Sequence, residues 1–253
     1  MTLRLERDGA VARLLIDRPD RRNALTQGMW ALLPHLVADA MADDAIRVLI
    51  LASATPGLFC AGADIDEFAT CSGDPDWRVA NQGAIRASQY ALAHAPKPVI
   101  AAIDGDCVGG GCGLAIACDL RIAAPAARLG ITPARLGIVY SLFDTKLLVD
   151  LVGPARAKRI LYTGALHSAE AAMAIGLVDE IAPDPLAAAD ALARTIAANA
   201  QHSVQSSKAI IRRILNGQAD DDATTLALFR DAFTLPDFAE GVAAFRAKRR
   251  PDF

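Results

Sequence analysis

The sequence lacks long hydrophobic runs, because no apolar stretch reaches about 18 residues without a charge. Residues 1–9 lack the apolar core of a signal peptide. Long basic clusters are also missing, and the formal net charge is −3. These features argue against a membrane-spanning segment, secretion and nucleic-acid binding. We therefore expect a cytoplasmic protein with neither a membrane nor a nucleic acid as its partner.

Metal-ligand spacings are missing as well. The five cysteines form no C-x-x-C pair, no histidine stands near one of them at metal-ligand spacing, and the four histidines are scattered. An odd number of cysteines without a secretion signal indicates reduced thiols. We expect no metal site and five free cysteines: Cys60, Cys71, Cys107, Cys112 and Cys118.

Three familiar nucleotide and hydrolase motifs are not found. The glycines between Gly109 and Gly113 fail the dinucleotide pattern G-x-G-x-x-G, because Leu114 and Ile116 stand where its last glycine belongs. There is no G-x-x-x-x-G-K-[ST] and no G-x-S-x-G. The sequence therefore gives no support for a Rossmann site, a P-loop or a hydrolase nucleophile elbow.

What the chain does contain is enough apolar sequence for a large core: 53% of its 253 residues are hydrophobic and 22% are charged. Strand-like and helical segments alternate up to residue 184, and from 185 to 253 the pattern is wholly helical. This arrangement predicts an α/β (α+β) core over 1–184 and a helical C-terminal subdomain over 185–253.

The individual segments follow from hydrophobic periodicity and helix-capping residues. Residues 74–81 form a looser polar stretch. Strands are expected at 3–5, 11–16, 47–52, 98–103, 120–123 and 177–181. Helices are expected after Thr26 and at 82–94, 144–152, 154–162, 168–176, 186–200, 204–215, 224–233 and 237–248.

Two units of strand, glycine loop and helix start recur about fifty residues apart. In the first, residues 53–63 lead to an acidic helix start at 64–67; in the second, strand 98–103 leads to Gly109–Gly111 and an apolar helix. Glycine lets a ligand approach peptide N–H groups closely, and a helix start carries partial positive charge. Such loops suit an anion, or a carbonyl oxygen that gains negative charge.

An ordered set of motifs resembles the crotonase (enoyl-CoA hydratase/isomerase) superfamily. The resemblance implies a spiral of β-β-α units with a helical tail that mediates trimers, often dimers of trimers. It also implies an acyl-CoA substrate and no further cofactor. The matching segments are residues 22–25, 59–65, 98–115, 117–123, 176–179 and 245–249.

The same resemblance implies the roles of particular residues. The peptide N–H groups of Ala63 and Gly110 would bind the thioester oxygen and stabilise an enolate. CoA would be bound by Arg22, Ala24, Ala61, Asp64 and Ile65, with Ile65 near the adenine. Phe245 and Lys248 are weaker matches that a neighbouring subunit would supply.

The sequence departs from the family at both acid–base positions. Family hydratases carry glutamates where this chain has Gly113 and Pro133, and neither residue can transfer a proton. Tyr140 and Asp144 are the remaining candidates for acid–base work. Tyr140 is as well explained by core packing, and Asp144 by a cap on the helix that follows it.

Three interpretations therefore stay open. The first is an enzyme of enoyl-CoA hydratase/isomerase type with unusual acid–base groups. The second is an acyl-CoA decarboxylase of methylmalonyl-CoA type, because residues 132–140 resemble the loop of those enzymes, although they carry histidine at the position of Ala63. The third is a non-catalytic homologue that binds acyl-CoA.

Overall fold

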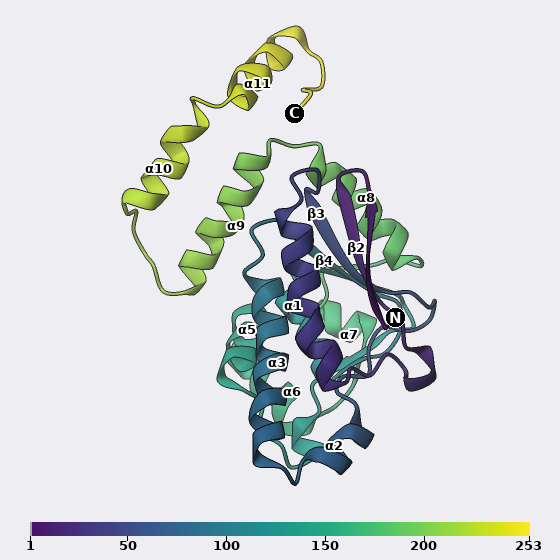
Figure 1. The fold of residues 1–253 in the computed structure, drawn as a ribbon. Coiled ribbons are helices and arrows are strands. Elements are labelled where there is room, and N and C mark those ends of the chain that lie inside the picture. The colour runs from purple at the N-terminus through teal and green to yellow at the C-terminus, as the bar shows by residue number, and fades with distance from the viewer. Residues whose placement is uncertain (1) are drawn as a thin grey trace.

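A twisted sheet runs through the body of the protein (Figure 1). The computed structural model describes residues 2–253, and within them the sheet has six strands. The first two strands form an antiparallel hairpin, and every later neighbour is parallel. In spatial order the strands are β1 (Leu3–Asp8), β2 (Val11–Ile16), β3 (Val48–Ser53), β4 (Val99–Ile103), β6 (Leu120–Ala123) and β9 (Glu180–Ile181).

A smaller sheet stands beside the end of β4. Its described strands are β5 (Cys107–Val108), β7 (Arg128–Gly130) and β8 (His167–Ser168). β5 pairs with β7 in parallel and leads directly into the three glycines at 109–111. This sheet therefore fixes the direction from which the glycine loop enters the following helix.

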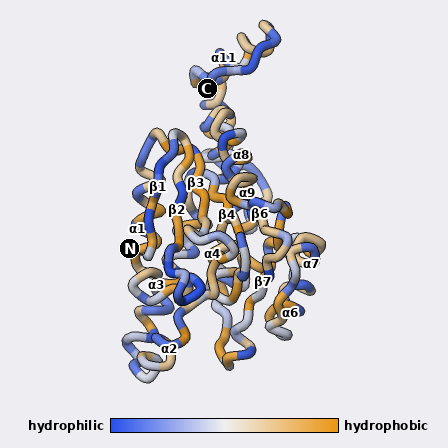
Figure 2. Tube along the Cα trace, turned by 90° about the vertical axis from the view of Figure 1, so that its right-hand side faces the viewer, coloured by the Kyte–Doolittle hydropathy of each residue, from blue (hydrophilic) through white to orange (hydrophobic). Residues whose placement is uncertain are grey.

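Both faces of the large sheet are covered, which explains why its strands are apolar throughout. Along β3, Leu49 and Leu51 face one layer of helices, whereas Val48 and Ile50 face the other. The first layer holds α1 (Gln27–Ala42), α3 (Pro75–Ala93) and α4 (Gly110–Ala117), and the second holds α8 (Pro185–Ala197). Figure 2 shows the hydrophobic strands β3 and β4 inside the body.

The other helices close the body and form the tail. Those of the body are α2 (Ile65–Cys71), α5 (Leu142–Val152), α6 (Pro154–Thr163) and α7 (Ala169–Ala174), with short 3-10 turns at η1 (Pro19–Arg21) and η2 (Pro133–Arg135). Those of the tail are α9 (Gln201–Leu215), α10 (Ala223–Ala232) and α11 (Pro236–Ala247). No described helix combines the length and apolar character needed to cross a bilayer.

The helical tail begins after α8, because α8 itself packs on the sheet. On α9, the Lys208 ammonium donates to the Asp119 carboxylate at 2.6 Å and to the Lys97 carbonyl at 2.9 Å. Burial lowers the pKa of Lys208, and the Asp119 carboxylate opposes that shift. α10 and α11 extend away from the body as an arm (Figure 1).

The polar stretch expected at 74–81 is instead the cap and roughly the first third of a helix. α3 begins at Pro75, and the Asp74 side chain caps it by accepting a hydrogen bond from the Asp76 N–H. Pro75 suits the first helical position because its φ is already helical and its missing N–H needs no partner. Hydrophobic periodicity failed here because this part of α3 is mostly exposed.

The position of the core predicts that two leucines contribute very differently to the free energy of unfolding. Leu51 is fully buried in β3 and Leu142 is 90% exposed at the start of α5. Leu51→Ala should lower the free energy of unfolding by about 2–5 kcal/mol, because it removes buried methylenes and leaves a cavity. Leu142→Ala should change it by less than about 0.5 kcal/mol. Chemical denaturation measures both, and equal effects would contradict the assigned core.

Candidate functional site

Three chain segments pair through their backbones to build the site. The first pair joins residues 22–25 to residues 61–64. The Ala61 N–H donates to the Arg22 carbonyl at 3.1 Å, the Leu25 N–H donates to the Gly62 carbonyl at 2.8 Å, and the Asp64 N–H donates to the Leu25 carbonyl at 2.9 Å. These bonds hold the segments predicted to bind CoA side by side.

The second pair joins residue 60 to the strand β5. The Cys60 N–H donates to the Asp106 carbonyl and the Val108 N–H donates to the Cys60 carbonyl, both at 3.0 Å. At Gly62 φ is +96°, and an added Cβ would lie 2.8 Å from the Val108 oxygen and 2.9 Å from the Gly110 nitrogen. Only glycine permits this approach, so the two predicted glycine loops are in direct contact.

The N–H groups of Ala63 and Gly110 have no hydrogen-bond acceptor among residues 2–253. Gly110 is the first residue of α4, where helix geometry leaves the N–H unpaired. A Cβ built on Gly110 would lie 3.6 Å from the Ala63 nitrogen. The structure thus brings the two predicted donors together at a helix start, where partial positive charge favours an anionic oxygen.

Trp30 forms the wall behind Gly110, and no sequence pattern marked this residue. Its ring is fully buried, and two ring atoms lie 3.0 and 3.2 Å from where a Gly110 Cβ would stand. On another side, the Thr132 hydroxyl lies 3.6 Å from the Cβ position of Gly109. Gly110 is therefore backed by α1, and the neighbouring Gly109 by the loop that precedes η2.

The Asn23 side chain hydrogen-bonds to three separate parts of the chain next to residues 22–25. Asn23 is fully buried with φ +57°, a left-handed conformation that asparagine tolerates better than most residues. Its amide nitrogen donates to the Ser53 hydroxyl and to the Phe59 carbonyl, each at 2.8 Å, and its oxygen accepts from the Arg18 N–H at 2.8 Å. Asn23 thereby fixes the conformation of the neighbouring residues 22–25.

The residues expected to contact CoA gather around the start of α2, and their role remains a prediction. Arg22 and Ile65 are exposed, and Ala24 and Ala61 are half-buried. Asp64 is different: its carboxylate caps α2 and accepts from the Arg18 guanidinium at 2.6 Å. That bond holds the pKa of Asp64 below its usual value, so the carboxylate is anionic and internally paired.

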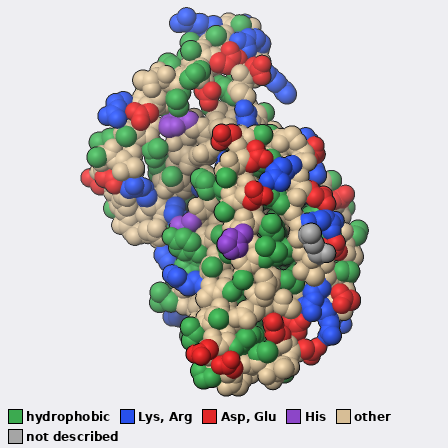
Figure 3. All heavy atoms as spheres, viewed as in Figure 1, with side chains coloured by type: hydrophobic (Ala, Val, Ile, Leu, Met, Phe, Trp, Pro, Cys, Tyr) green, Lys and Arg blue, Asp and Glu red, His purple; other side chains and the backbone are tan. Residues whose placement is uncertain are grey.

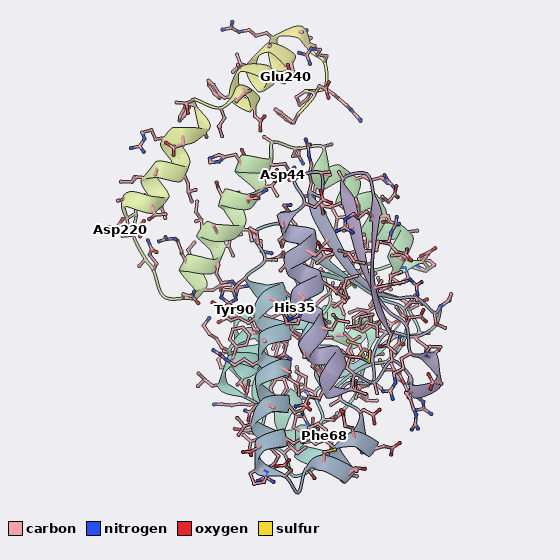
Figure 4. The ribbon with its side chains drawn as sticks, in the orientation of Figure 1. His35, Asp44, Phe68, Tyr90, Asp220 and Glu240 are labelled. Atoms are coloured by element: carbon pink, nitrogen blue, oxygen red, sulfur yellow. The ribbon has the colours of Figure 1, made fainter. Side chains whose placement is uncertain are left out.

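Phe245 and Lys248 lie far from this site within one chain. Both belong to the end of α11, where Phe245 is 86% exposed. Figure 4 shows Glu240 of α11 and Phe68 of α2 at opposite ends of the molecule. A single chain therefore does not bring these two residues to the predicted CoA segments, and a role for them requires a second copy.

A buried polar cluster lies one turn along α4 from Gly110. A Cβ on Gly113 would stand 3.0 Å from the Tyr140 hydroxyl and 3.4 Å from Cδ of Gln89. With its amide oriented to satisfy its surroundings, Gln89 donates from its side-chain nitrogen to the Asp144 carboxylate, 3.1 Å from Oδ2. The cluster thus contains both predicted acid–base residues, and it adds Gln89, which no sequence motif marked.

The expectation that Asp144 caps α5 is wrong. The cap is Ser141, whose hydroxyl accepts from the Asp144 N–H at 3.1 Å, and Asp144 lies in the first turn. Both positions favour acidic or hydroxyl side chains, so the sequence alone did not separate them. Burial raises the pKa of Asp144, which the Ser141 hydrogen bond and the nearby charge of Arg86 oppose.

Tyr140 both packs against the core and reaches the cluster. Its buried hydroxyl has no hydrogen-bond partner among the described residues. Burial, with the Asp144 charge as a further cause, raises the pKa of Tyr140 well above its usual value. The hydroxyl is therefore protonated at neutral pH and available as a donor.

Comparison with known proteins agrees with this geometry. The sequence model of the enoyl-CoA hydratase/isomerase family matches residues 6–253. The chain is 35% identical to the crotonyl-CoA hydratase of Syntrophomonas wolfei, over 98% of this chain and 96% of that one. The chain belongs to the enoyl-CoA hydratase/isomerase family.

Solved structures of the enoyl-CoA hydratase/isomerase family share the fold. An enoyl-CoA hydratase/isomerase family protein from Hyphomonas neptunium has a TM-score of 0.96 at 40% identity, with 100% of this chain and 97% of that chain covered. The enoyl-CoA hydratase of Bacillus anthracis has a TM-score of 0.91 at 32% identity, with 100% and 99% covered. The predicted crotonase fold is thereby confirmed.

The raised pKa of Asp144 predicts how stability depends on pH. An unfolded aspartate has a pKa of about 3.9. Because the folded pKa is higher, the folded state binds more protons between the two values, and the stability of the native protein falls as pH rises through that window. Asp144→Asn keeps an acceptor for Gln89 and removes the charge, so it should raise the free energy of unfolding at pH 7.

Chemical denaturation between pH 4 and pH 7 measures this effect, with Asp44→Asn at an exposed position as the control. The gain from Asp144→Asn should shrink as the pH approaches 4. A loss of stability at pH 7 would show that the folded protein prefers the ionised carboxylate.

Proposed function

We propose that the protein is an acyl-CoA lyase or isomerase of enoyl-CoA hydratase/isomerase type whose reaction passes through a thioester enolate. The single observation that carries this proposal is the meeting of two acceptor-free N–H groups, those of Ala63 and Gly110. Both would donate to the thioester oxygen, and the hydrogen bonds would strengthen as negative charge grows there. Each donor of this kind contributes about 3 kcal/mol to transition-state stability in other enzymes.

For hydration of an enoyl thioester, a water oxygen bonds to C3 while the C2–C3 π electrons move toward the thioester oxygen. The water proton passes to the Asp144 carboxylate, and a proton is then delivered to C2, so that one water is added in total. A raised pKa suits Asp144 to this exchange, because a general base works best near the operating pH. The protonated Tyr140 hydroxyl would donate to the developing charge.

Decarboxylation is the second candidate, because neither Gly113 nor Pro133 supplies a carboxylate next to the donors. In that reaction the bond between C2 and the carboxylate breaks, CO₂ leaves, and its electron pair forms the enolate. No base is needed for this step. A proton delivered to C2, with Tyr140 as the nearest protonated group of the cluster, completes the reaction.

Incubation with enoyl-, malonyl- and hydroxyacyl-CoA thioesters, followed by mass spectrometry, tests these alternatives. The relative from Syntrophomonas wolfei is named for crotonyl-CoA, which makes crotonyl-CoA the first substrate to try. A gain of water supports hydration, and a loss of CO₂ supports decarboxylation. Isomerisation leaves the mass unchanged, so proton NMR of the same mixtures reports any shift of the double bond. Binding with neither a mass change nor such a shift would support a non-catalytic homologue, and no binding of any acyl-CoA would contradict all three.

Gly110→Ala tests the donor pair directly. Its methyl group would lie 3.0 Å from the Trp30 ring and 3.6 Å from the Ala63 nitrogen, within the space assigned to the thioester oxygen. We expect kcat/KM on the substrate found above to fall by roughly 10²-fold. Gly73→Ala is the matched control, because its Cβ would meet no atom within 4 Å. Equal kinetics for both variants would contradict the assigned site.

The exposed tail supports a homotrimer or a dimer of trimers as the working form. No residue of α9 is buried, and large apolar side chains also lie exposed on α10 and α11. Figure 3 shows hydrophobic side chains on this arm. Burying them against other copies would contribute about 25 cal/mol for each Å² of apolar surface removed from water. A partner's tail would also supply Phe245 and Lys248 to the site.

Phe229→Asp tests the tail contact. Phe229 is 70% exposed on α10, so an aspartate there removes an edge contact with the Phe233 ring but costs little else within one chain. It strongly disfavours burial against a partner. We expect sedimentation velocity to show smaller species for this variant than for the parent protein. Val79→Asp, 74% exposed on α3, is the control. A monomeric parent protein would contradict the proposed assembly.

A further inference from the structure

Gln89 occupies the space that a side chain at position 113 would need. A Cβ on Gly113 would contact the end of the Gln89 amide, with Cδ at 3.4 Å. Gln89 is only 1% exposed, so its side chain has no path to solvent. The buried Gln89 amide therefore fits in this position only because residue 113 is a glycine.

The same amide reaches Asp144 on the neighbouring helix. α3 and α5 both pack against α4, which brings the Gln89 amide next to Gly113 and the Asp144 carboxylate next to that amide. With its amide oriented as described above, the Gln89 nitrogen donates to both oxygens of the Asp144 carboxylate, to Oδ1 and, at 3.1 Å, to Oδ2. Asp144 is 5% exposed, so this hydrogen bond has little competition from water and fixes the carboxylate in place.

Gly113 lies on the same face of α4 as Gly110, because residues three apart on a helix are neighbours. We propose that Gln89 is the positioning residue of the acid–base site: its amide holds the Asp144 carboxylate beside Gly113, one helical turn from the oxyanion donor at Gly110. This inference rests on the proposed function, where Asp144 transfers the proton.

The groups around Asp144 determine the direction in which Gln89 shifts its pKa. Arg86 on α3 is the nearby cation, and Tyr140 precedes α5. The buried thiols of Cys107 and Cys112 lie near enough to Tyr140 to contribute to its raised pKa. Burial favours the neutral acid, whereas an N–H donor favours the carboxylate. Removing the Gln89 donor therefore takes away one of the interactions that counter the effect of burial on the Asp144 pKa. Asp144 should then hold its proton to a higher pH.

Gln89→Met tests this, because methionine has similar length and no donor. The carboxyl signal of Asp144 in a ¹³C NMR titration, assigned by its loss in Asp144→Asn, should move to higher pH by about one unit. The limb of the pH–rate profile that reports Asp144 should move in the same direction. Gln82→Met, at an exposed position of α3, is the matched control and should leave both unchanged.

Gly113→Ala provides a second route, because its methyl group must displace the Gln89 amide. It should reproduce the shift in the titration of Asp144, and Gln89→Ala in the same chain should restore the stability lost to crowding. An unchanged titration in both Gln89→Met and Gly113→Ala would overturn the inference. A shifted titration with an unchanged pH–rate profile would leave the contact in place, but it would overturn the positioning role and remove Asp144 from the proposed chemistry.

Discussion

Backbone pairing among three separate segments is the constraint on which the site depends. Residues 22–25, 60–64 and 106–110 are joined by hydrogen bonds, and Gly62 lets two of the segments touch. A fully buried N–H without an acceptor costs about 1–3 kcal/mol, and a half-buried one costs less because water reaches it in part, so proteins leave few of either kind unpaired. Here two such groups, at Ala63 and Gly110, lie together among the residues that the structure describes. The neighbouring backbone groups are paired and hold the two loops in place, and under the proposed function the N–H groups of Ala63 and Gly110 bind the thioester oxygen.

The buried cluster beside α4, formed by Gln89, Tyr140 and Asp144, also contains polar groups that lower the stability of the fold. A carboxyl group whose pKa is raised by burial lowers stability at neutral pH, and a buried hydroxyl without a partner adds to that cost. Such features are concentrated at functional sites, where chemistry rather than stability explains them. Gly113 makes room for the arrangement, because a side chain there would exclude the Gln89 amide.

Much of the fold followed from the sequence, because strand alternation, helix caps and glycine runs are local signals. The roles of Ala63 and Gly110 came from the resemblance to the crotonase superfamily and remain a prediction, although the two glycine loops that carry these residues were accessible for the same reason. Gln89 and Trp30 were not, since each is an ordinary residue within a helix and gains its role only from packing against α4. Asp144 was assigned the wrong alternative role because Ser141 competes for the cap, and part of α3 was missed because it faces solvent.

A crystal structure with butyryl-CoA, the saturated thioester that cannot be hydrated, tests the central claim most directly. The account predicts a thioester oxygen within hydrogen-bonding distance of the nitrogens of both Ala63 and Gly110, with C2 and C3 of the acyl chain on the side of Tyr140 and Asp144. A thioester oxygen bound away from these two nitrogens would contradict it.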